Sequence, residues 1–77
     1  MRPLYFRCTD ASRNADKWYA VHVGCNLFGD LEVVCRWGRM GGNGHQERSV
    51  TCASRRQAGS IVRDIVALRR AHGYTES

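Results

Sequence analysis

Hydrophobic and polar residues alternate along the first two-thirds of the chain and predict four β-strands. The alternation is clearest at residues 18–25, where Tyr19, Val21 and Val23 share one face. Asn, Gly and Asp residues lie between the alternating runs, as is typical of turns. Shorter runs of the same kind predict strands at residues 3–9, 31–40 and 46–52.

A single amphipathic helix is predicted after the last strand. Ser54 and Gln57 have the spacing of a capping box, which satisfies free backbone N–H groups where a helix begins. Gly73 is well placed to end the helix. The apolar residues that recur at helical spacing, and that we expect to be buried, are Ala58, Ile61, Val62, Ile65 and Leu68.

This order of elements predicts an α+β fold. We expect an antiparallel β-sheet of about four strands, with one C-terminal amphipathic helix packed on one face. A chain of 77 residues has room for one modest core, so residues 1–77 are expected to form a single domain.

A glycine-rich segment, 41–44, joins the third and fourth predicted strands, and its Asn43-Gly44 pair favours a type I′ turn. Directly before it, the segment 36–39 (Arg-Trp-Gly-Arg) places an indole ring between two guanidinium groups. Arg forms forked hydrogen bonds to phosphate and Trp offers a stacking face, so this segment suits a flat, anionic partner that carries rings. Gly38 has no side chain, so a ligand or a second strand can approach its backbone closely.

Trp37 has two interpretations. It shares strand parity with Val33 and Cys35, which predicts a core tryptophan packed under the helix. Strand ends near a hairpin often twist out of the buried layer, and this favours an exposed ring instead. Arg36 and Arg39 likewise either contact a ligand or form exposed ion pairs of little energetic value.

The basic character of the chain comes almost entirely from arginine. The net charge is +5, with eleven Arg and one Lys, which indicates either phosphate contacts or the codon bias of a GC-rich genome. Arg56, Arg63 and Arg70 are seven residues apart and lie along one helix face, away from the apolar stripe. They form either an electrostatic footprint for a phosphate backbone or an ordinary solvated face.

Other kinds of chemistry find little support in the sequence. The four cysteines include no C-x-x-C pair, so buried free thiols are expected, with a disulfide or metal site as the alternative. No nucleophile, base and acid can be grouped by spacing, so we expect neither an enzyme nor a cofactor. No apolar run approaches about 18 residues and no signal peptide is evident, so a cytoplasmic protein without membrane contact is expected.

Several ordered segments carry a resemblance to a known family. They are Leu4-Tyr5-Phe6-Arg7 with Asn14, Lys17-Trp18-Tyr19, Asn26-Leu27-Phe28-Gly29, Arg36-Trp37-Gly38-Arg39-Met40-Gly41, Arg56-Gln57-Ala58 and His72-Gly73-Tyr74. Together they resemble a stand-alone bacterial WGR domain over nearly the full length of the chain. The family also occurs in poly(ADP-ribose) polymerases, where it takes part in recognising DNA ends, and in bacterial proteins described as molybdate metabolism regulators.

The resemblance implies a non-enzymatic module that binds nucleic acid, and DNA is expected ahead of RNA. In the polymerases the motif Trp packs on a sugar at a DNA end and the motif Arg lies at the DNA and domain interface, which carries over to Trp37 and Arg39. The complete set of residues expected to bind nucleic acid is Arg36, Trp37, Gly38, Arg39, Arg56, Arg63 and Arg70.

Two alternatives stay open. The hairpin or an exposed sheet edge could serve a protein partner or a homodimer in place of nucleic acid. Tyr5, Trp18 and His22 could extend an aromatic platform, or could form a second small core on the other sheet face.

Overall fold

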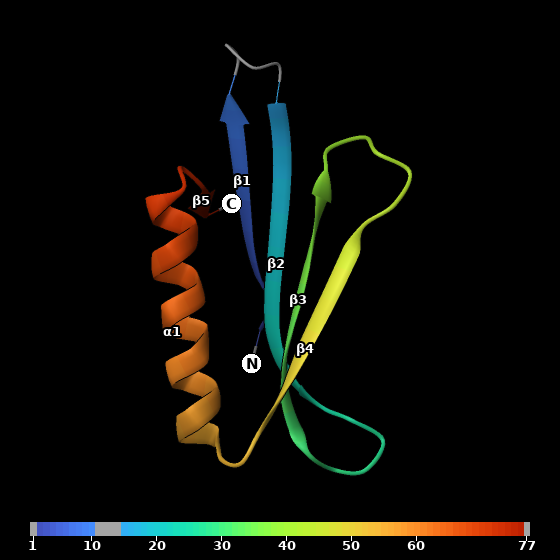
Figure 1. Cartoon of the computed structure of the whole chain (residues 1–77), viewed down its shortest axis with the longest axis vertical. Coiled ribbons are helices and arrows are strands. Elements are labelled where there is room, and N and C mark those ends of the chain that lie inside the picture. The colour runs from blue at the N-terminus through green and yellow to red at the C-terminus, as the bar shows by residue number, and fades with distance from the viewer. Residues whose placement is uncertain (1, 11–14, 77) are drawn as a thin grey trace.

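The computed structural model describes residues 2–10 and 15–76. Within these residues the chain forms one five-stranded antiparallel sheet and one helix, which confirms the predicted α+β class (Figure 1). The spatial order of the strands is β4-β3-β2-β1-β5. The elements are β1 (Leu4–Asp10), β2 (Ala15–Cys25), β3 (Leu31–Arg39), β4 (Gln46–Cys52), α1 (Arg55–Ala71) and β5 (Thr75–Glu76).

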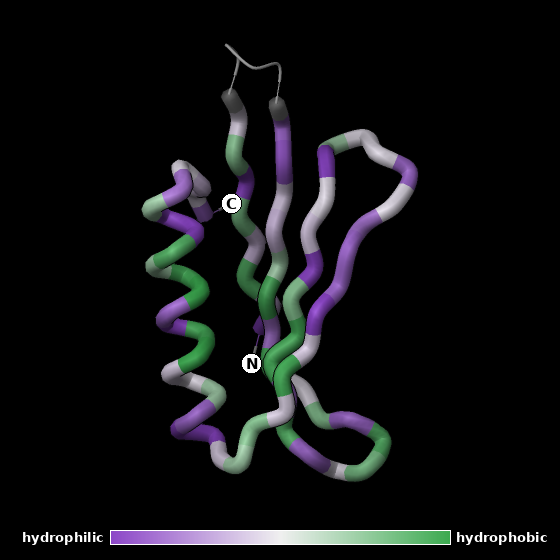
Figure 2. The backbone as a smooth tube through the Cα atoms, in the orientation of Figure 1, coloured by the Kyte–Doolittle hydropathy of each residue, from purple (hydrophilic) through white to green (hydrophobic). Residues whose placement is uncertain are grey.

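The core lies between α1 and the sheet face that the alternation predicted. Phe6, Val21 and Val33 are fully buried there, and Ala58 and Val62 cover them from the helix. Apolar and polar segments alternate along α1 in Figure 2. Leu68, expected to be buried, is 49% exposed, so that part of the predicted stripe is wrong.

Both predicted helix ends are observed. The Ser54 side chain accepts a hydrogen bond from the Gln57 N–H at 3.1 Å, while Gln57 Oε1 accepts from the N–H of Ala53, just before the cap. At the other end Gly73 has a φ of +87°. The N–H of Tyr74 donates to the carbonyl of Arg69 at 3.0 Å, which closes the helix and turns Tyr74 back towards the sheet.

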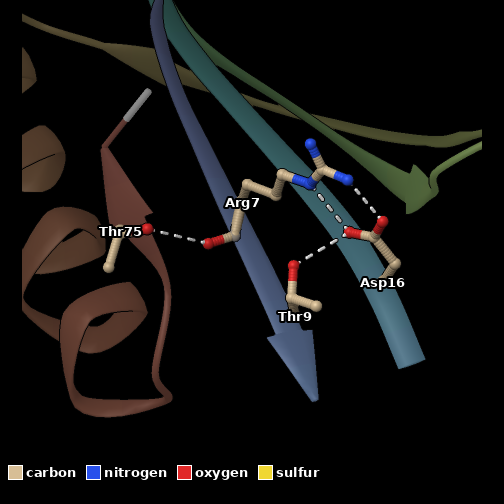
Figure 3. Close-up of polar contacts among 4 residues, drawn as sticks. All are labelled: Arg7, Thr9, Asp16 and Thr75. Carbon is tan, nitrogen blue, oxygen red and sulfur yellow. Dashed lines mark hydrogen bonds and ion pairs between the residues drawn. The ribbon is translucent and has the colours of Figure 1, made fainter. Parts of the chain in front are cut away.

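Two features of the sheet go beyond the prediction. The second strand begins at Ala15, earlier than predicted, and pairs with β1 along this added part. There Asp16 accepts two hydrogen bonds from the Arg7 guanidinium, at 2.9 and 2.6 Å, and one from the Thr9 hydroxyl (Figure 3). The two-residue strand β5 pairs with β1, and its Thr75 hydroxyl donates to the Arg7 carbonyl at 3.3 Å. So short a strand carries too little alternation to be recognised in a sequence.

The type I′ turn predicted at Asn43-Gly44 is wrong. Gly41 in the link between β3 and β4 is left-handed, with a φ of +75°, and Gly44 is not. The Gly42 N–H donates to the Arg39 carbonyl at 3.1 Å, which fits a type II turn. The Met40 N–H donates to the Asp16 carbonyl of β2, beyond the last β3–β4 pair, so β3 stays attached to β2 where the turn begins.

Across residues 2–10 and 15–76, no helix has the length and apolar character needed to cross a membrane.

Candidate nucleic-acid interface

Trp37 lies on the helix-facing side of the sheet, directly across from Tyr19 of β2. The two rings are nearly parallel, with centroids 5.8 Å apart and an angle of 13°. Tyr74 meets Tyr19 edge-on at 6.2 Å. Trp37 is partly buried and packs against the core cluster. It is therefore intermediate between the two interpretations, a core tryptophan and an exposed ring.

Arg69 completes this aromatic cluster, although the sequence did not single it out. Its guanidinium carbon lies 4.7 Å from the centre of the Tyr19 ring and 5.4 Å from that of Tyr74, within cation–π range. Its buried Nε has no hydrogen-bond partner among the described residues. Arg69 lies four residues after Ile65 and seven after Val62, so helical spacing could have placed it on the inner face.

Burial raises the pKa of Tyr19 to about 12, with a further contribution from a hydrogen bond to Cys35. The positive charges of Arg69 and Arg48 act in the opposite direction but do not outweigh the burial. The Tyr19 hydroxyl is therefore neutral at physiological pH, and Tyr19 acts as an uncharged ring beneath Trp37.

Beside Trp37 the surface forms an open depression of about 380 Å³, called here the Trp37 depression. Lys17 and Arg39, two of its lining residues, are cross-strand partners and both are exposed. None of the lining residues is acidic. The full lining is Lys17, Trp37, Gly38, Arg39, Gly44, His45, Gln46 and Tyr74.

Gly38 is closely covered by the chain itself. A Cβ added there would lie 3.1 Å from the Gly44 carbonyl oxygen and 3.2 Å from Trp18 Nε1. The sequence suggested a close approach by a ligand or second strand. The observed neighbours are the indole of Trp18 and the loop before β4, so Gly38 lets these two parts of the protein close over β3.

The other predicted site residues are not gathered around Trp37. Alternation along β3 places Arg36 on the opposite sheet face, where its Nε pairs with Glu47 Oε1, one of the exposed ion pairs considered from the sequence. This hydrogen bond is the main reason why the pKa of Glu47 lies below its usual value. Arg56, Arg63 and Arg70 are exposed, and helical geometry places them on the side of α1 away from Ala58 and Val62. The structure therefore brings together Trp37, Gly38 and Arg39.

The cysteines are free thiols. Cys35 and Cys52 are buried as expected, but Cys25 is exposed, so the prediction of burial is wrong for Cys25. Within the part of the chain that the structure describes, no group of three or more His, Cys, Asp or Glu side chains is arranged to hold a metal ion.

Comparison with known proteins supports the resemblance. The model of the WGR domain family matches residues 2–77. An uncharacterized protein, y4dW, of Sinorhizobium fredii is 34% identical over 71 residues, which cover 92% of this chain and 34% of that protein. The chain thus spans about a third of the length of this relative. No solved structure matches the chain. The comparisons indicate no catalytic family, and the family match over nearly all residues shows that this chain belongs to the WGR domain family.

Proposed function

We propose that this protein binds nucleic acid, with DNA ends as the preferred ligand, and that the Trp37 depression is the binding surface. Trp37 stacks on the terminal sugar or base, while Arg39 and Lys17 contact the phosphates next to it. The protein contributes binding and no catalysis. It remains a prediction from the sequence that residues 1–77 form a single domain and that the protein is cytoplasmic.

The arrangement of Trp37 and the two cations carries this proposal. The Trp37 ring lies nearly parallel to the Tyr19 ring at 5.8 Å, a contact that limits its movement before a ligand arrives. Lys17 and Arg39 lie in one cross-strand pair at the rim, and no acidic residue lines the depression. A fixed aromatic ring beside paired cations suits a ligand that presents a ring and an anionic group together.

The remaining predicted arginines take a smaller part in this proposal. Arg36 is held by Glu47 on the opposite face, and Arg56, Arg63 and Arg70 lie on the outer side of α1. They add to the net charge of +5, which attracts a polyanion over a distance of about 10 Å, without touching the bound end.

A titration of fluorescently labelled DNA tests the proposal. A blunt hairpin is compared with a closed dumbbell of the same duplex sequence, which has no ends, at about 50 and 200 mM salt. We expect tighter binding to the hairpin, and a steep loss of affinity with salt for both. Arg39→Ala should weaken hairpin binding more than Arg63→Ala, the matched change on the outer side of α1. Absence of binding to either DNA at low salt would overturn the proposal.

A second candidate function is self-association through the opposite end of the sheet. Leu27 and Phe28, at the tip of the β2–β3 hairpin, are 101% and 88% exposed. Next to this tip, Cys25 and Leu31 border a groove of about 320 Å³ that also touches Ala58. A projecting apolar pair beside a groove suits a symmetric contact with a second copy of the chain. Light scattering on the wild type and on Phe28→Ser tests it, with a dimer expected only for the wild type.

A further inference from the structure

The sheet face opposite α1 carries a depression of its own, with a volume of about 500 Å³. Helix α1 packs on the other face, and no further helix is present in residues 2–10 and 15–76 to cover this one (Figure 1). We call it the helix-free depression. Its lining residues are Pro3, Tyr5, Trp18, Ala20, His22, Arg36 and His45.

Strand register explains the shape of this hollow. Ala20 lies at its centre, with Tyr5 as its cross-strand partner on β1 and Arg36 as its partner on β3. Trp18 and His22 lie two residues before and after Ala20 on β2, so all four larger side chains are on the same face. The small side chain of Ala20, surrounded by larger ones, leaves a hollow between them.

The walls of the hollow are rich in ring systems. The Trp18 and His45 rings lie 5.9 Å apart at an angle of 53°, and Tyr5 is 55% exposed. Trp18 and His22 are only partly buried, and neither belongs to the core cluster. Trp18, His22 and Tyr5 all keep exposed surface, which fits the aromatic-platform interpretation.

The charge of the hollow is compatible with nucleic acid. No acidic residue lines the hollow, and Arg36 stands at its edge. The Arg36 guanidinium is paired with the nearby Glu47, and this hydrogen bond is the main reason why the pKa of Glu47 is lowered. Arg36 is thus neutralised by its partner, no lining residue is acidic, and the rings of the walls are the feature that suits exposed bases.

The two depressions meet at His45, which lines both. Trp37 and Trp18 belong to neighbouring strands but face opposite sides of the sheet, and Gly38 lies beneath the Trp18 indole. Because His45 borders both, the two depressions are continuous at this residue.

From this continuity we propose that the helix-free depression is a second nucleotide subsite, which stacks an unpaired base extending from the end bound at Trp37. The inference rests on the proposed function, since it assigns a second subsite to the same nucleic-acid strand. The ligand class is single-stranded nucleic acid, whose exposed bases stack on aromatic side chains.

Three DNA hairpins test the subsite: one blunt, one with a short single-stranded extension, and one whose extension consists of abasic nucleotides. The wild-type protein should bind the extended hairpin about tenfold more tightly than either of the others, the effect of one stacked base. Trp18→Ala and Tyr5→Ala should each remove this gain and leave blunt-end affinity within about twofold. Thr51→Ala, an exposed change elsewhere on the same sheet face, is the matched control and should keep the gain.

The indole N–H resonances of the wild-type protein provide a second readout that does not depend on how Trp18→Ala folds. With Trp18→Phe used for assignment, the blunt hairpin should shift the Trp37 resonance, and the extended hairpin should also shift that of Trp18. Blunt-end binding with no gain from the extension, or an equal gain from the abasic extension, would overturn the subsite and leave the proposed function standing. No binding to any hairpin would overturn both.

Discussion

Trp37 and Tyr19 are cross-strand partners whose rings lie 5.8 Å apart and within 13° of parallel. Tyr19 is buried and Trp37 only partly so, which means that one ring of the pair belongs to the core and the other reaches the surface. The family motif is thus supported by a residue 18 positions earlier in the chain.

We predict that Tyr19→Leu weakens end binding as well as stability. Loss of the ring contacts with Trp37 and Tyr74 and of the Arg69 cation–π contact should lower the free energy of unfolding by about 1–3 kcal/mol. Trp37 would lose its support, so DNA-end affinity should also fall severalfold. Tyr19→Phe keeps the ring and loses only the hydrogen bond to Cys35, so it should bind DNA like the wild type and lose at most about 1 kcal/mol in urea unfolding. Wild-type affinity in Tyr19→Leu would show that Trp37 needs no support from this ring.

The contacts of Gly38 lead to a prediction about packing. Gly38→Ala places a Cβ 3.1 Å from the Gly44 carbonyl oxygen and 3.2 Å from Trp18 Nε1. One of these neighbours is backbone and cannot move alone, so we expect a loss of about 1–3 kcal/mol in the free energy of unfolding. Gly44→Ala is the matched control, because a Cβ there meets nothing within 4 Å. Equal stability of the two variants in chemical denaturation would contradict the packing role of Gly38.

Replacing Gly59 and Gly73 by alanine should change the stability of the protein in opposite directions. Gly73 has a φ of +87° where α1 ends, so Gly73→Ala should lower stability by about 1 kcal/mol or more. Gly59 lies within α1 with open space around it, so Gly59→Ala should raise stability by about 0.5–1 kcal/mol. Thermal unfolding of both variants is the measurement, and a change of the same sign in both would contradict the assigned helix end.

Acid should weaken the β1–β2 pairing through Asp16. The hydrogen bond from Arg7 lowers the pKa of Asp16 in the folded protein below its ordinary value of 3.8. The unfolded chain therefore takes up a proton first, and the stabilisation that is complete above about pH 5 declines as the pH falls through the folded pKa. In Asp16→Asn the free energy of unfolding should fall less steeply as the pH is lowered. Asp64→Asn, which removes an exposed carboxylate on α1, is the control and should keep the wild-type slope. The test is the free energy of unfolding from pH 6 down to about pH 2, where parallel curves for Asp16→Asn and wild type would argue against the pair.

Much of the fold follows from the sequence because alternation and capping are local signals. The predicted bounds of the strand at residues 46–52 match β4, and Ser54 and Gly73 mark the helix ends. What was missed depends on contacts between distant residues. One such contact is the hydrogen bond from the Met40 N–H to the Asp16 carbonyl, directly before the left-handed Gly41.

The candidate site shows the same division between local and distant signals. Trp37 and Arg39 share strand parity, so their presence on one face follows from alternation. Arg36 has the other parity and therefore lies on the opposite sheet face, although it is adjacent to Trp37 in the sequence motif. Tyr19, Arg69 and Tyr74 come from three different elements or links, and only the folded chain brings them beside Trp37.

The most direct measurement of the central claim is the end preference of Trp37→Ala. The preference is the ratio of dissociation constants for the closed dumbbell and the blunt hairpin, with Trp37→Phe as the variant that keeps a ring and circular dichroism to check folding. We predict that Trp37→Ala reduces this ratio to near one while dumbbell binding stays within about twofold, since phosphate contacts alone do not distinguish an end. A folded Trp37→Ala protein that keeps the wild-type ratio would contradict the claim that Trp37 recognises the end.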